Sequence, residues 1–204
     1  MLNVLIAGVG GQGSVLAAKI LAQAAMEKGW QVRTAETIGM AQRGGNVLSH
    51  VRMGNLGEEV HAPLVPQGAA DCVIALEPGE GLRALPFLAP EGLLVSAQTP
   101  IASIASELSG TSYDARAVLA HLERVVQHFA QVDDNAICTA AGSRKVLNVG
   151  MLAEAVRESD LLECGLYGAI TLCDLRDALY ACVKPHFIDM NLAAVESVYA
   201  SDNV

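Results

Sequence analysis

The stretch VLIAGVGGQG, close to the start of the chain, places glycines between an apolar run and a helix-forming run. Gly8, Gly10 and Gly13 have the spacing G-x-G-x-x-G, in which a tight turn leaves the N–H groups of the following helix facing outward. Such N–H groups attract phosphate or carboxylate, so the spacing predicts an anion or nucleotide site. The alternative is that the glycines only let strand and helix pack closely. Gly11 and Gln12 weigh against packing alone, because the spacing requires neither of them.

A second segment, GMAQRGGNVLSHVRMG, also contains residue types that can bind a ligand. Gln42 and Arg43 precede Gly44 and Gly45, soon after a predicted strand. That position is near the carboxyl edge of the sheet, where open α/β folds bind their ligands. The guanidinium of Arg43 can pair with a carboxylate or a phosphate. The alternative is a solvated loop arginine.

The histidines show no spacing typical of a metal site or a catalytic dyad. His50 and His61 have no cysteine or carboxylate placed as a ligand set, so we expect strand-face or surface side chains. His121 and His128 lie seven residues apart in one predicted helix and are expected to be exposed. We therefore predict no catalytic residue and no metal ligand in this chain.

The cysteines are odd in number and form no Cys-x-x-Cys pair. Eight residues lie in each gap between Cys164, Cys173 and Cys182, which is unlike the spacing of a cluster site. We expect buried, reduced thiols at all five positions, which also include Cys72 and Cys138.

The order of apolar segments predicts how these residues are positioned. A buried strand over residues 2–8, a helix that ends at Gly29 and a strand over residues 30–36 form a right-handed βαβ unit. We expect an α/β, Rossmann-like layered fold, with a mostly parallel sheet flanked by helices and a mainly helical C-terminal part. Residues 1–204 are expected to form a single domain. The further strands are predicted at 46–54, 70–78, 91–99 and 129–133, and the further helices at 81–88, within 114–130, and at 145–159, 171–183 and 189–201.

Composition excludes several classes of partner. The formal charge is −9, with 22 acidic against 13 basic residues, which opposes binding to a nucleic acid backbone. No apolar run approaches the ~20 residues that cross a bilayer. The first residues follow a strand pattern without a basic leader. We expect a cytoplasmic protein with no membrane partner.

The two glycine-bearing motifs together resemble the gamma-type domain of the 2-oxoacid:ferredoxin oxidoreductases, the pyruvate/ketoisovalerate oxidoreductase family. Within that family, ETIGMAQRGG is most similar to the small beta subunit type of the indolepyruvate ferredoxin oxidoreductases. The segments VLNVGMLAEAV and DMNLAAVESVY are similar to late helical segments of the same domain. The chain departs from the pattern at Ile38, where similar subunits have a histidine.

The resemblance implies a small subunit of a complex that oxidatively decarboxylates a 2-oxoacid, such as indolepyruvate or another arylpyruvate, with coenzyme A and ferredoxin. It implies that thiamine diphosphate, Mg²⁺ and iron–sulfur clusters belong to a large partner subunit, and that this chain binds none of them. The glycine turn and the loop over residues 42–45 would then meet the partner or help to close over coenzyme A.

Two alternatives remain open from the residues. One is a stand-alone Rossmann-like protein that binds NAD or FAD, in which Glu36 at the end of the second strand takes the place of a ribose-binding acid. The other is a purely structural scaffold subunit whose loops serve only interface packing.

Overall fold

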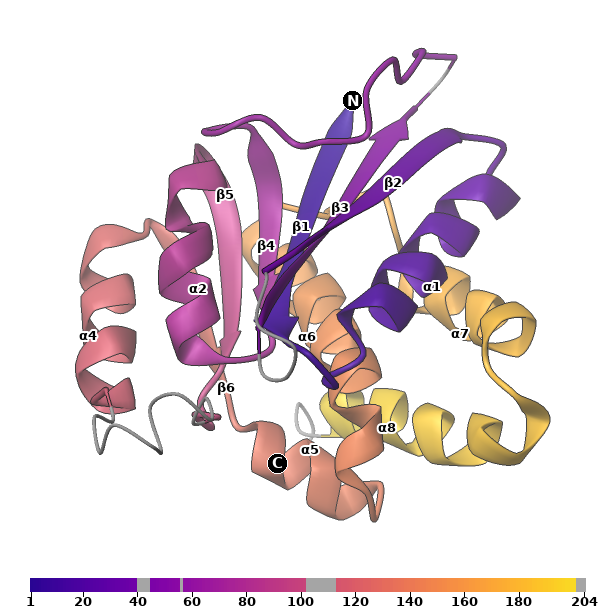
Figure 1. The fold of residues 1–204 in the computed structure, drawn as a ribbon. Coiled ribbons are helices and arrows are strands. Elements are labelled where there is room, and N and C mark those ends of the chain that lie inside the picture. The colour runs from indigo at the N-terminus through magenta and orange to yellow at the C-terminus, as the bar shows by residue number, and fades with distance from the viewer. Residues whose placement is uncertain (40–44, 56, 102–112, 201–204) are drawn as a thin grey trace.

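The centre of the fold is a six-stranded sheet in the order β2-β3-β1-β4-β5-β6 (Figure 1). This computed structural model describes residues 1–39, 45–55, 57–101 and 113–200. β3 is antiparallel to both of its neighbours, whereas the β1–β4, β4–β5 and β5–β6 ladders are parallel. The expected α/β class and mostly parallel sheet are thus confirmed. The strands are β1 (Leu2–Val9), β2 (Gln31–Ile38), β3 (Asn46–Gly54), β4 (Ala70–Ala75), β5 (Leu88–Ala97) and β6 (His128–Val132).

Helices cover both faces of the sheet (Figure 1). On one face α1 (Ser14–Glu27) packs on β1, β2 and β3, and α6 (Leu147–Leu162) packs on β4, β5 and β6. The later helices α7 (Leu172–Cys182) and α8 (Ile188–Ala200) pack on α1 and α6, so the C-terminal part is mainly helical, as expected. On the opposite face lie α2 (Pro78–Ala84) and α4 (Ala115–Val125).

The structure differs from expectation between β5 and α6. The helix expected within residues 114–130 ends at Val125, because Val126 already has an extended backbone. His128 therefore belongs to β6 and does not share a helix with His121. A further helix, α5 (Asp134–Ala140), was not predicted. Its sequence, DNAICTA, is too short to show helical periodicity.

All five cysteines are free thiols, but they are not uniformly buried. Cys72 and Cys138 are buried as expected, whereas Cys173 is exposed because its position on α7 faces away from the core. Within the ranges given above, no cluster of three or more His, Cys, Asp and Glu side chains is arranged to bind a metal ion. None of the described helices combines the length and the apolar character that a membrane crossing requires.

His50 holds the connection between β3 and β4 against the sheet. Its side chain is 3% exposed, and its Nδ1 accepts a hydrogen bond from the backbone N–H of Val65 at 3.2 Å. Because Nδ1 is the acceptor, the neutral ring carries its proton on Nε2, which lies 3.3 Å from Thr37 Oγ1. Burial lowers the pKa of His50 below its ordinary value. His50 therefore contributes to stability in its neutral form.

We predict that His50→Leu lowers the free energy of unfolding by about 1–3 kcal/mol at pH 8, because the buried Val65 N–H loses its acceptor. The pKa of His50 is lowered in the folded state, so its contribution is complete above the unfolded-state pKa and is lost as the pH falls through the folded-state pKa. The difference between wild type and variant should therefore shrink towards pH 5 in urea titrations. His61→Leu, at an exposed histidine, is the control. A difference that stays constant with pH would contradict the prediction.

Candidate functional site

The glycine turn joins β1 to α1 at the edge of the sheet where the parallel strands end. Gly13 is the N-cap of α1 with a φ of 82°, a conformation that glycine adopts without strain. A Cβ at Gly13 would also lie 2.8 Å from Asn148 Nδ2, so the position has no space for a side chain. No side chain caps α1, and its first turn contains no acidic residue. The first N–H groups of α1 are therefore available to an anion.

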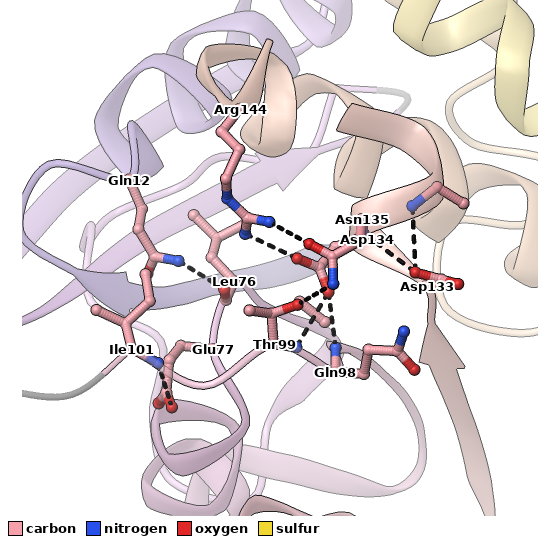
Figure 2. A network of polar contacts seen from close by, with 12 residues as sticks. Gln12, Leu76, Glu77, Gln98, Thr99, Ile101, Asp133, Asp134, Asn135 and Arg144 are labelled. Atoms are coloured by element: carbon pink, nitrogen blue, oxygen red, sulfur yellow. Dashed lines mark hydrogen bonds and ion pairs between the residues drawn. The ribbon is translucent and has the colours of Figure 1, made fainter. Parts of the chain in front are cut away.

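Gln12 connects the ends of two neighbouring strands. Its Oε1 accepts a hydrogen bond from the Val9 N–H at 2.7 Å. Its Nε2 donates to the Leu76 carbonyl at 2.6 Å, as Figure 2 shows. A Cβ at Gly8 would lie 2.9 Å from Gln12 Oε1, so the glycine makes room for this amide. Gln12, which we predicted to contact a ligand, thus also stabilises the turn.

The two glycine-bearing motifs of the sequence lie next to each other in the fold. The backbone N–H of Gly10 donates to the carbonyl of Gly45 at 2.9 Å, and Val9 pairs with Asn46 across the β1–β3 ladder. Gly45 is therefore beside the glycine turn. The other predicted residues of that loop, Gln42, Arg43 and Gly44, lie outside the described residues.

A cavity of about 330 Å³ lies between the glycine turn and the start of α6. Asn148, in the first turn of α6, donates from Nδ2 to the Gly13 carbonyl at 3.0 Å and so holds the two helix starts together. Its Oδ1 is buried and has no hydrogen-bond partner among the residues that the structure describes. α6 continues the helical turn Arg144–Val146, which the Ser143 hydroxyl caps, and the Leu147 N–H donates to the Arg144 carbonyl. The lining residues are Gly11, Gln12, Gly13, Leu16, Ile101, Arg144, Lys145, Leu147 and Asn148.

The electrostatic character of this cavity favours an anion. Two helix N-termini converge on it, and each helix N-terminus carries a partial positive charge. Arg144 and Lys145 add two cations, and no acidic residue is among the described side chains that line it. By contrast, four other described helices, α2, α4, α5 and α7, begin with side-chain caps from Glu77, Asp114, Asp133 and Thr171. The uncapped start of α1 is therefore free to bind a phosphate or carboxylate.

Arg144 is held by two neighbouring side chains at the rim of the cavity (Figure 2). Its Nη2 donates to Asp134 Oδ2 at 2.8 Å, and its Nη1 donates to Asn135 Oδ1 at 2.6 Å. Asp134 is fully buried, whereas the Arg144 side chain is 46% exposed. The guanidinium thus combines a fixed position with access to solvent and to the cavity.

Glu77 holds Ile101, which belongs to the segment that follows β5. Its carboxylate accepts hydrogen bonds from the N–H of Glu80 at 3.0 Å and from the N–H of Ile101 at 3.4 Å. Burial raises the pKa of Glu77, and the neighbouring charge of Glu80 acts in the same direction. Because Ile101 lines the cavity, Glu77 helps to shape its wall.

Sequence reasoning missed Arg144, Lys145 and Asn148. One signal was present: Arg144 and Lys145 are the only two basic residues adjacent to each other in the chain. They follow Ser143, whose hydroxyl accepts a hydrogen bond from the Lys145 N–H at 3.2 Å and begins the helical turn before α6. What the sequence does not contain is the spatial relation between this turn and a glycine loop some 130 residues earlier.

The proposed ribose-binding position of Glu36 is wrong. In a Rossmann dinucleotide fold the second strand lies beside the first, which brings its terminal acid close to the glycine turn. Here β3 lies between β1 and β2, so Glu36 is two strands from the turn, about 10 Å across the sheet. Its exposed side chain lines a different groove, between α1 and β2.

The sequence has relatives that match over nearly its full length. The family model described as pyruvate ferredoxin/flavodoxin oxidoreductase matches residues 3–201. Indolepyruvate oxidoreductase subunit IorB of Archaeoglobus fulgidus is 36% identical over 97% of this chain and 94% of its own length. The protein of the same name from Thermococcus kodakarensis is 30% identical, with 95% of this chain and 92% of that protein covered.

Solved structures share the fold at lower sequence identity. The gamma subunit of a keto/oxoacid ferredoxin oxidoreductase from Geobacter sulfurreducens superposes with a TM-score of 0.66 at 21% identity, covering 98% of this chain and 99% of that one. A 2-oxoglutarate:ferredoxin oxidoreductase from Magnetococcus marinus gives a TM-score of 0.67 at 17% identity. The match covers 98% of this chain but 30% of that longer one.

We predict that Gln12→Ala lowers the free energy of unfolding by about 1–3 kcal/mol, because the Val9 N–H and the Leu76 carbonyl lose a shared partner. Thermal or urea unfolding measures the change. Gln67→Ala, at an exposed glutamine, is the matched control and should stay within about 0.5 kcal/mol of wild type. Equal stability of the two variants would show that the Gln12 amide does not brace the turn.

Proposed function

The chain belongs to the pyruvate ferredoxin/flavodoxin oxidoreductase family, and from this premise we propose that it is the small subunit of a 2-oxoacid:ferredoxin oxidoreductase. The substrate we propose is an arylpyruvate such as indolepyruvate. The support is the two relatives named as indolepyruvate oxidoreductase subunits, at 36% and 30% identity over nearly the whole chain. The length of the family match, residues 3–201, supports one domain over residues 1–204.

The division of labour we propose places the reactive groups on a large partner subunit. Thiamine diphosphate with Mg²⁺ supplies the electron sink that lets the 2-oxoacid lose its carboxylate, and iron–sulfur clusters carry the electrons to ferredoxin. This chain contributes no catalytic residue. The glycine turn and the loop over residues 42–45 contact the partner or help to close the site, and the turn's backbone N–H groups bind an anion.

The anion we propose is a phosphate group of coenzyme A. The observation that carries this proposal is the cavity at which the uncapped N-terminus of α1 meets Arg144 and Lys145. Coenzyme A presents phosphate and diphosphate groups, which match such a site. The Magnetococcus marinus structure is described as having 2-oxoglutarate, coenzyme A and succinyl-CoA bound. Here the residues nearest to the phosphate would be Gly11, Gly13 and Arg144.

The subunit role predicts activity only in the complex. The purified chain should reduce no dye in the presence of indolepyruvate and coenzyme A, because the electron sink and the clusters belong to the partner. Adding the separately purified large subunit should restore reduction at a rate that saturates with this chain. Steady-state assays with indolepyruvate and with pyruvate would also compare the two substrates. Turnover by the purified chain on its own would overturn the proposal.

The coenzyme A site predicts a specific kinetic change for Arg144→Met. Loss of a charge-assisted hydrogen bond of about 1.5–3 kcal/mol corresponds to a KM for coenzyme A about 10–100-fold higher. The KM for the 2-oxoacid should stay constant. Arg176→Met removes an exposed arginine on α7, outside the residues that line the cavity, and is the matched control. If both variants keep the wild-type KM for coenzyme A, the cavity does not bind that ligand.

A further inference from the structure

Asp134 is a fully buried carboxylate whose two oxygens serve different partners. Oδ1 accepts the backbone N–H groups of Gln98 at 3.1 Å and of Thr99 at 3.0 Å. Oδ2 accepts the guanidinium of Arg144 at 2.8 Å. A buried charge is costly unless it is paired and hydrogen-bonded, and here both requirements are met. The carboxylate therefore joins the end of β5, the start of α5 and the turn that precedes α6.

The contacts with Asp134 and Asn135 fix the orientation of the Arg144 side chain. Each of its terminal nitrogens donates to a different acceptor, so the plane of the guanidinium is defined. An arginine has more N–H donors than these contacts use, and the half-exposed group retains donors for a ligand. A free arginine would have to be ordered when the ligand binds, and this cost is reduced when the side chain is already held in place.

The same carboxylate also holds part of the cavity wall. The backbone N–H groups of residues 98–99 donate to the Asp134 carboxylate. In addition, Asn135 Nδ2 donates to Thr99 Oγ1 at 2.9 Å. Ile101, two residues after Thr99, lines the cavity. Figure 2 shows Arg144 and the residues 98–99 converging on Asp134 from different segments. The buried Asp134 carboxylate thus fixes both the Arg144 guanidinium and the neighbouring part of the cavity wall.

We propose that Asp134 is a positioning residue of the anion site: it holds Arg144 in the orientation that binds a phosphate of coenzyme A. The inference rests on the proposed function, because it names the residue that prepares that site. Asp134 does not contact the ligand itself. It acts through Arg144, and its effect on binding should therefore vanish when Arg144 is absent.

The first test is Asp134→Asn in the complete complex. The asparagine oxygen can still accept the N–H groups of Gln98 and Thr99, whereas its amide nitrogen then faces the Arg144 guanidinium as donor against donor. The KM for coenzyme A should rise about 3–30-fold at unchanged kcat, which reflects the loss of a prepositioned ionic contact. Asp133→Asn makes the same chemical change at the adjacent N-cap, where asparagine also caps well, and should leave KM unchanged.

The second test repeats Asp134→Asn in an Arg144→Met background. A positioning role predicts no further rise in KM beyond that of Arg144→Met, whereas a merely structural role predicts that the two effects multiply. The inference would be overturned, with the proposed coenzyme A site left standing, by either of two results. One is that the two effects on KM multiply. The other is that Asp134→Asn leaves KM unchanged while Arg144→Met clearly raises it. No effect of Arg144→Met would overturn the proposed coenzyme A site together with the inference.

Asn135→Ala provides a variant at an exposed position if Asp134→Asn does not yield a folded complex. It removes one of the two acceptors of Arg144 and leaves the buried carboxylate in place. The KM for coenzyme A should rise by a smaller factor, about 2–5-fold, and this rise should also disappear in the Arg144→Met background. If Asn135→Ala leaves the KM for coenzyme A unchanged while Arg144→Met raises it, the proposal that Asp134 and Asn135 position Arg144 is contradicted.

Discussion

The hydrogen bond from Asn148 to the carbonyl of Gly13 is the contact on which the candidate site depends. It joins residues 135 positions apart in the sequence and brings the starts of α1 and α6 to one cavity. The contact requires glycine at position 13, because a Cβ there would lie against the Asn148 amide. Since α1 has no side-chain cap, its first N–H groups stay available at this cavity, and Arg144 and Lys145 add charge to them.

Local features of the fold could be read from the sequence because their causes are local. The glycine turn and the strand before it follow from neighbouring residues, and the structure has them. The position of β3 between β1 and β2 could not be read in this way, because a strand pattern does not state which edge the strand joins. The same holds for Arg144 and Asp134, whose roles arise only when α5 and α6 pack beside β5.

The insertion of β3 also changes the chemistry that the glycine turn can support. It moves Glu36 away from the turn and brings Gly45 next to Gly10 instead. A dinucleotide-binding half would use an acid at the second strand to select a ribose, so the site here lacks that means of selection. Its described side chains select negative charge, such as that of a phosphate group, and do not select a ribose.

The charge balance of the chain determines how such a ligand can be bound. The formal charge is −9, so the overall field of this chain repels an anion and does not steer it to the cavity. Charges are screened over about 8 Å at physiological ionic strength, whereas the contacts at the cavity act at hydrogen-bond distance. Binding must therefore come from the fixed geometry of the helix starts and of Arg144. The buried Asp134 carboxylate, which holds Arg144 in place, reduces the entropy cost of ordering the arginine when a ligand binds.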